Sequence, residues 1–459
     1  MSYLGNTPTT QNFISGTDYF NGTGAQTAFT LSRTVASVND IQVTVNNVVQ
    51  QPNSGYTLSG TTLTFDQAPS AGTQNVYVRY LSTTTQVITP SQNTVSWNTL
   101  DANTRGDLGI SFKNRIINGN MAIDQRNAGA SVTITGTNAS DYVIDRWFAR
   151  AISATGSRIS VQRSTVAPAG FTNSQLVTSL SAYTLGSSES FGVMQAIEGF
   201  NVADLGWGTA NAQTITISFK VRSSLTGTFG GFITNEAGNR CYVFSYTINS
   251  ANTFEDKSIT IPGDTTGTWQ TNNSAGITIA FSVGAGSSVT GTAGSWGSTL
   301  LRSVTGQTSL VGTNGATFYL TGVQLEVGTQ ATAFSTAGGS YGAELALCQR
   351  YLFRISGTAA YTRFGVAEVD GVSNANAIVY SPVSMRTTPS LTTTGTASNY
   401  GIYSGGGVVA CTSLGIEGTS SPTLFLINCG TAGGLTSGRA GNLLANNNST
   451  AFLQFSAEL

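Results

Sequence analysis

Short runs of alternating apolar and polar residues, separated by clusters of turn-forming residues, constrain the fold of this chain more than any other feature. Such a run occupies residues 41–45, and the pattern returns at 61–65 and 75–81. Alternation with a period of two is typical of strands that bury one face. Residues 66–72 (DQAPSAG) form a turn cluster between the last two runs. We therefore predict a small β-domain over residues 1–88.

The middle of the chain, residues 114–342, continues in the same way. Gly, Asn and Ser clusters separate its apolar runs, at the spacing of an all-β sandwich of the jelly-roll or lectin-like kind. Five strands are predicted there: 214–221, 241–248, 257–261, 276–283 and 316–327.

The last of these strands changes phase. Phe318 and Leu320 lie on one phase of the alternation, whereas the apolar residues of 323–327 lie on the other. A one-residue slip at Gly322 would bring both sets to the same face. We therefore predict a β-bulge at Gly322.

Two further regions complete the division of the chain. Residues 89–113 resemble a linker, within which 100–108 is predicted as a short helix or a collar turn. Residues 343–459 are predicted to form a C-terminal β tip domain, so we expect an all-β chain with several jelly-roll-like β-sandwich domains in a row. Its start, 344–352, fits a helix turn, although 351–355 fits a strand better. The alternation over 450–459 predicts a docked strand at the end of the chain.

Charge is scarce. Only 9% of the 459 residues are charged, against roughly 25% in an average soluble domain, and the net charge is −1. Without a basic stripe we expect no binding to nucleic acid. We find neither an apolar run that would span a bilayer nor a signal peptide, so we expect no membrane insertion and synthesis in a cytoplasm. A surface with so little charge favours burial against copies of the same chain.

The chain has no histidine, which excludes Ser-His-Asp and Cys-His catalysis. No metal site or cofactor is predicted, since the cysteines form no CxxC pair. We expect four reduced, buried thiols, with a Cys411–Cys429 disulfide as the alternative to test. The cysteines are Cys241, Cys348, Cys411 and Cys429.

A carboxylate pair is the remaining route to an enzyme, since two carboxylates cleave glycosidic bonds. Glu198 and Asp204 are the nearest candidates, but a local structural role for Glu198 is favoured, so we expect no enzymatic activity. The stretches 145–147 (DRW) and 124–126 (DQR) fit structural ion pairs better than a ligand site.

Five phrases in the middle of the chain carry a family resemblance. They resemble the opening, the interior and the closing of a β-sandwich module of phage tail fibers and related virion appendages. The phrases are NRIINGNMAIDQRN (114–127), YVIDRW (142–147), QAIEGFNVADL (195–205), VQLEVGTQATAF (323–334) and AELALCQRY (343–351). Residues 20–80 are similar to an N-terminal module of fiber proteins of podovirus-like phages.

This resemblance implies a structural virion fiber that recognises and adsorbs to a host surface by multivalent binding of cell-surface polysaccharide or lipopolysaccharide. It implies a homotrimer in the tail or fiber of a virion, attached to other virion proteins, in the tail or an adaptor, through residues 1–88. A capsid-mounted decoration fiber and a polysaccharide-degrading tailspike remain as alternatives.

We predict that receptor contacts lie in the near-neutral C-terminal tip, where aromatic rings and amides suit sugars. The alternative for each residue is an ordinary surface amide or a core tyrosine. The predicted contact residues are Asn399, Tyr400, Tyr403, Asn428, Asn446 and Asn447.

Overall fold

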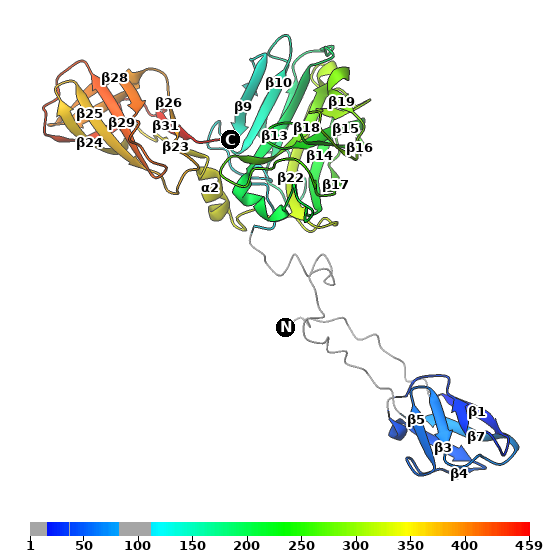
Figure 1. Ribbon diagram of the computed structural model, residues 1–459. Coiled ribbons are helices and arrows are strands. Elements are labelled where there is room, and N and C mark those ends of the chain that lie inside the picture. The colour runs from blue at the N-terminus through cyan, green and yellow to red at the C-terminus, as the bar shows by residue number, and fades with distance from the viewer. Residues whose placement is uncertain (1–15, 36, 82–111) are drawn as a thin grey trace. The chain divides into compact units, whose positions relative to one another are not determined.

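The computed structural model describes residues 16–35, 37–81 and 112–459 (Figure 1). The chain divides into two compact units, 1–96 and 97–459, and each is described by itself. The predicted linker lies outside the described residues except for its last two positions, and so does the predicted helix or collar turn at 100–108.

Two small antiparallel sheets make up the N-terminal unit, and the three strands predicted there are confirmed. The core between the sheets is formed by alternating residues such as Val43, Leu63 and Val78, which are fully buried. One sheet has the order β1 (Thr17–Gly22), β7 (Gly72–Tyr80), β3 (Ile41–Val45), β4 (Val48–Val49); the other has β2 (Ala28–Thr30), β6 (Thr62–Phe65), β5 (Tyr56–Ser59).

The middle of the chain is a jelly-roll-like sandwich of a seven-stranded and a six-stranded antiparallel sheet (Figure 1). The first has the order β20 (Trp296–Gly297), β16 (Cys241–Ile248), β15 (Gly227–Thr234), β18 (Ala275–Ala285), β13 (Ser190–Glu198), β10 (Trp147–Ile152), β9 (Asn138–Ile144). The second has β17 (Glu255–Ile261), β14 (Ile215–Ser223), β22 (Thr317–Val327), β12 (Ser174–Ser179), β11 (Ile159–Ser164), β8 (Val132–Thr133). A short parallel pair, β19 (Thr290–Gly291) and β21 (Ser303–Val304), forms a separate two-stranded sheet that packs against β15 and β16.

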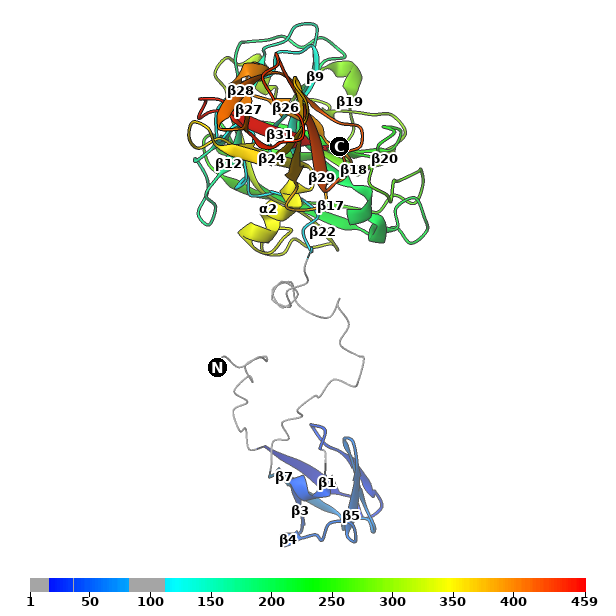
Figure 2. The ribbon, with the colours of Figure 1, turned by 90° about the vertical axis from the view of Figure 1, so that its left-hand side faces the viewer.

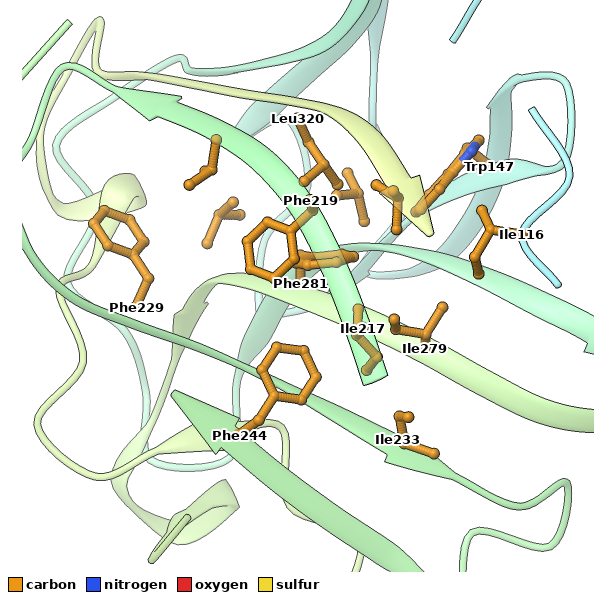
Figure 3. Close-up of a cluster of buried hydrophobic side chains, with 14 of the residues drawn as sticks. Ile116, Trp147, Ile217, Phe219, Phe229, Ile233, Phe244, Ile279, Phe281 and Leu320 are labelled. Carbon is orange, nitrogen blue, oxygen red and sulfur yellow. The ribbon is translucent and has the colours of Figure 1, made fainter. Parts of the chain in front are cut away.

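The five strands predicted for this region are confirmed as β14, β16, β17, β18 and β22. Their inward-facing side chains fill a core rich in aromatic and β-branched residues (Figure 3). Phe219 from the six-stranded sheet meets Phe281 from the seven-stranded sheet, with ring centroids 4.9 Å apart. Interdigitation of this kind holds the two sheets face to face.

The predicted bulge at Gly322 is confirmed. The register between β14 and β22 shifts between Ser218 and Lys220, where two residues of β22 oppose one residue of β14. Gly322 has φ +62°, a left-handed conformation that side chains rarely adopt. Because of the shift, Leu320 and Val323 are both fully buried in the same core.

The C-terminal region starts with helix α2 (Tyr341–Gln349), and strand β23 (Leu352–Ser356) follows it. The helix turn and the strand that the sequence offered as alternatives therefore occur one after the other. Strand β23 forms a three-stranded sheet with β31 (Phe452–Ser456) and β26 (Ser390–Thr393). Alternate residues from Ala451 to Ala457 are buried, as predicted for a docked C-terminal strand.

The all-β class is confirmed, but the tip is not a further sandwich. Six of its strands close into a barrel. In barrel order they are β24 (Arg363–Gly371), β25 (Asn374–Tyr380), β29 (Leu424–Thr431), β28 (Gly407–Ile416), β27 (Tyr400–Ser404) and β30 (Ala440–Ala445). Figure 2 labels four of them, β24, β27, β28 and β29. The sequence did not distinguish the two folds, because the alternation of apolar residues is the same in a closed sheet and in a layered one.

Short 3₁₀ helices and buried thiols complete the described structure. All four cysteines are free and buried, as expected. No helix among the described residues is long and apolar enough to cross a membrane. The 3₁₀ helices are η1 (Val38–Asp40), η3 (Gly199–Asn201), η4 (Ala203–Leu205), η5 (Ser287–Val289), η6 (Leu310–Gly312) and η7 (Ala397–Asn399).

Candidate binding site

A pocket of about 310 Å³ lies beside the Gly322 bulge, where β14 and β17 meet the segment that follows β22. This volume is at the lower end of the range for small-molecule sites. We call it the Phe334 pocket. Its lining residues are Ser218, Phe219, Lys220, Asp256, Lys257, Ser258, Gly322, Ala331, Thr332, Ala333 and Phe334.

The aromatic wall of the Phe334 pocket depends on the bulge. The half-buried ring of Phe334 packs against Phe171, with centroids 5.1 Å apart. Phe171 in turn lies against Gly322, where a β-carbon would come within 2.9 Å of its ring. The bulge therefore provides the space in which the two rings meet.

Charged and hydroxyl groups face this wall. The Lys220 Nζ is 2.5 Å from the Asp256 Oδ1 on the neighbouring strand and 5.8 Å from the centroid of the Phe171 ring. Ser218 and Ser258 add hydroxyl groups to the lining. Because Asp256 is well exposed, the ion pair remains open to exchange one of its bonds for a ligand hydroxyl.

Buried partners hold the loop that carries Phe334. The Thr332 backbone N–H donates to the Glu326 Oε1 at 2.9 Å, and its hydroxyl donates to the Glu326 Oε2 at 2.7 Å. The Lys113 Nζ also donates to the Thr332 hydroxyl, at 2.5 Å. This preorganisation lowers the entropic cost of binding at Phe334. The arrangement presents an aromatic face beside hydroxyls and an ion pair.

The two carboxylates considered for catalysis do not share a site. Glu198, 1% exposed, accepts two hydrogen bonds from Arg350, at 2.8 and 2.5 Å, and one from the Tyr351 hydroxyl at 2.5 Å. Burial alone would raise the pKa of Glu198, but the bonds from Arg350 and Tyr351 outweigh it and lower the pKa. Asp204 is 56% exposed and pairs with Arg115. Glu198 therefore has a structural role, in agreement with the prediction from the sequence.

The residues of the five phrases meet one another in space. The Asn118 backbone N–H donates to the buried Glu344 Oε1 at 2.5 Å, across 226 positions of sequence. The Gln195 amide bonds both the N–H and the carbonyl of Ile117, at 3.0 and 2.8 Å. Asn114 bridges to the backbone of Leu325 at 3.1 Å. The phrases thus encode a buried polar network that closes the sandwich and docks α2.

The DRW and DQR stretches form structural ion pairs, as predicted, and these pairs belong to the same network. Arg126 and the fully buried Arg146 both pair with Glu458, near the end of the chain. The Arg146 guanidinium lies 3.5 Å from the centroid of the Tyr351 ring. Burial raises the pKa of Asp145 to about 6, although Gln125 donates two hydrogen bonds to its carboxylate.

Among the predicted tip residues, Tyr400 needs correction. It is 0% exposed and belongs to the core of the barrel. Its hydroxyl donates to the Phe452 carbonyl at 2.5 Å. The core-tyrosine alternative is therefore the right one, because an apolar ring with a satisfied hydroxyl is more stable inside the barrel.

The other predicted residues lie on the barrel in three separate places. The backbone N–H of Asn446 donates to the carbonyl of Asn399, in η7, at 2.8 Å. Asn447, the next residue, is exposed. Tyr403 is half-buried near the guanidinium of Arg363, 5.5 Å from the ring centroid. Asn428 donates to Asn376 on β25 at 3.2 Å. The structure does not gather these residues into one site.

Sequence reasoning missed the Phe334 pocket. Its residues come from β14, β17 and the segment after β22, which are distant in sequence. The one available signal was Gly322, since bulges often lie next to functional sites. Among residues 16–35, 37–81 and 112–459, no group of three or more Cys, Asp or Glu side chains is placed to hold a metal ion.

Comparison with known proteins finds solved structures that are similar to this chain at low sequence identity. No protein-family model matches the sequence, and no curated protein matches it. Similar solved structures include the enzymatically active domain of tailspike protein 4 of bacteriophage CBA120, with 10% identity, 43% of this chain and 21% of that chain covered, and a TM-score of 0.24. The match thus spans about a fifth of the tailspike chain.

Two sugar-related structures are also similar. One is a proposed sugar-binding protein from Bacteroides thetaiotaomicron, with 11% identity, 47% and 100% of the two chains covered, and a TM-score of 0.28. The other is a family 11 carbohydrate-binding module of a Clostridium thermocellum cellulase, with 12% identity, 45% and 99% covered, and a TM-score of 0.21.

Proposed function

We propose that this chain is a virion fiber protein that adsorbs to a host by binding cell-surface polysaccharide or lipopolysaccharide. The observation that carries the proposal is the Phe334 pocket, in which an aromatic face lies beside hydroxyl groups and an exposed ion pair. Sugars offer the matching chemistry, since one face of a pyranose ring is apolar and its edges carry hydroxyls.

The aromatic and charged side chains of this pocket determine how a sugar would bind there. The apolar face of a sugar ring stacks on Phe334, while its hydroxyls donate to Asp256 and accept from Lys220. The two charges cancel, so binding should survive moderate salt. Affinity at one such site is modest. A homotrimer, with several fibers on a particle, would multiply it by raising the effective concentration of sites.

The division of labour along the chain is part of the proposal. Residues 1–88 attach the fiber to other virion proteins, and the sandwich and the C-terminal barrel face the host. Asn399, Tyr403, Asn428, Asn446 and Asn447 remain proposed secondary contacts on the barrel. A capsid-mounted decoration fiber would use the same glycan contacts but a different mounting point.

Imaging and mass measurement test the assignment. Electron cryo-microscopy of particles that carry this chain should locate it in fibers attached through its N-terminal domain, and light scattering of the purified chain should give three times the monomer mass. A density located inside the capsid, or a stable monomer at micromolar concentration, would contradict the proposal.

A further inference from the structure

A second cavity, of about 150 Å³, lies at one end of the sandwich. It shares no lining residue with the Phe334 pocket. The turn after β13 and the connection from β17 to β18 form it. Its apolar lining comes from Trp207, Trp269, Val202 and Ile277, and its polar lining includes Gln270 and Thr271. We call it the tryptophan cavity.

The two indoles present carbon surface rather than polar atoms. The rings of Trp207 and Trp269 meet edge to face, with centroids 4.7 Å apart. The Trp207 Nε1 donates to the Gln213 carbonyl at 2.8 Å, and the Trp269 Nε1 donates to the Thr266 carbonyl at 3.2 Å. Because both N–H groups are satisfied, the rings are held in place and their apolar parts are left to line the cavity.

The polar lining keeps unused hydrogen-bonding capacity. The Gln270 side chain accepts one contact among the described residues, from Asn272 at 3.5 Å, the limit for a hydrogen bond. Thr271 is exposed, and its hydroxyl has no partner among those residues. A guest that fills the apolar part can therefore pair an adjoining amide with Gln270 or Thr271.

Size and chemistry together select the guest. A cavity of about 150 Å³ has room for a guest about the size of benzene. That is too small for a whole sugar together with its water shell, but it suits one apolar substituent attached to a polar group. An acetamido group has this form, a methyl joined to an N–H and a carbonyl.

We propose that the tryptophan cavity binds the acetamido group of an N-acetylated sugar. The proposal rests on the proposed function as a glycan-binding protein and deepens it, because it names a class of sugar. A glycan that reaches both this cavity and the Phe334 pocket gains avidity from the pair.

Tryptophan fluorescence of the full chain provides the test, because Trp207 and Trp269 line the cavity and only phenylalanine rings line the Phe334 pocket. Titration with N-acetylglucosamine should change the emission and saturate in the millimolar range, whereas glucose should leave it unchanged. Ala203→Phe, which places a ring at the exposed Ala203 of the lining, should weaken the response at least tenfold. Gln270→Ala should also weaken it, without filling the cavity.

Phe334→Ala separates the two sites. The response to N-acetylglucosamine should persist in this variant. Equal responses to both sugars, no response to either, or an undiminished response in both Ala203→Phe and Gln270→Ala would overturn the cavity proposal. Polysaccharide binding that is lost in Phe334→Ala, together with no response to N-acetylglucosamine, would contradict the cavity proposal alone and leave the proposed function standing.

Discussion

The carboxylate of Glu198 and the guanidinium of Arg350 form a two-point ion pair, at 2.8 and 2.5 Å, between the last residue of β13 and the residue that follows α2. The pair joins the sandwich to the start of the C-terminal region. It also unites two sequence phrases that lie 152 positions apart. What looked in sequence like a potential catalytic acid is thus a junction of the fold.

Removal of the Glu198 charge should destabilise the protein. Loss of one partner from a buried ion pair costs about 3–5 kcal/mol, and the partial exposure of Arg350 reduces this to about 2–3 kcal/mol. We expect this loss for Glu198→Gln in urea unfolding followed by tryptophan fluorescence. Asp204→Asn is the matched control: its exposed pair with Arg115 should contribute less than about 1 kcal/mol. Equal losses of stability in the two variants would contradict the claim that the buried Glu198–Arg350 pair stabilises the fold.

The chain should not cleave polysaccharide. Glu198 is engaged by Arg350 and Tyr351, and Asp204 by Arg115, so the two carboxylates are not presented together as an acid and a nucleophile. Incubation with host surface polysaccharide should leave its size distribution unchanged, as measured by size-exclusion chromatography. Shortening that disappears in Glu198→Gln would establish a tailspike activity instead.

Asp145 should make stability depend on pH. Burial raises its pKa from an ordinary 3.8 to about 6, so the folded state holds the proton more tightly than the unfolded state. Its contribution to stability is therefore greatest below about pH 4 and falls as the pH rises to about 6, by roughly 3 kcal/mol.

The Asp145→Asn variant isolates this effect, since asparagine does not titrate. The free energy of unfolding of the variant, relative to wild type, should increase as the pH rises from 4 to 7. Unfolding curves at several pH values measure the difference. A difference that stays constant over this range would show that Asp145 titrates alike in the folded and unfolded states.

Gly322 should tolerate no side chain. Alanine there must adopt a left-handed conformation, and its β-carbon would lie 2.9 Å from the Phe171 ring. We expect a loss of about 1–2 kcal/mol in the free energy of unfolding, together with weaker glycan binding, because the aromatic wall shifts. Gly312→Ala, whose β-carbon would find its nearest neighbour at 3.6 Å, should leave both quantities unchanged. A neutral Gly322→Ala would mean that the bulge does not constrain the pocket.

Local patterns predicted much of this fold. Alternation located the strands, because the period of side-chain direction in a strand is a local property. The phase change around Gly322 even located a bulge, since Phe318 and Leu325 both had to reach the core. Alternation did not distinguish the barrel from a sandwich, because closure of a sheet depends on which strands pair at its edges.

Local patterns did not predict the Phe334 pocket. Phe334 and Lys220 are brought together by pairing of β14 with β22, and no neighbouring residue in sequence marks either of them. Tyr400 shows the opposite error. The composition of the tip predicted Tyr400 at the surface, whereas the alternation of apolar residues places it, with Ile402, in the barrel core.

Glycan binding by a Phe334 variant tests the central claim most directly. Wild type, Phe334→Ala and the control Tyr341→Ala, which removes a ring that is 64% exposed at the start of α2, should be compared by biolayer interferometry against a panel of purified bacterial lipopolysaccharides and capsular polysaccharides. We predict that at least one glycan binds wild type and Tyr341→Ala equally, and that Phe334→Ala binds it about tenfold more weakly, since loss of aromatic stacking costs about 1.4 kcal/mol. Undiminished binding by Phe334→Ala, or no binding of any glycan by wild type, would contradict the account.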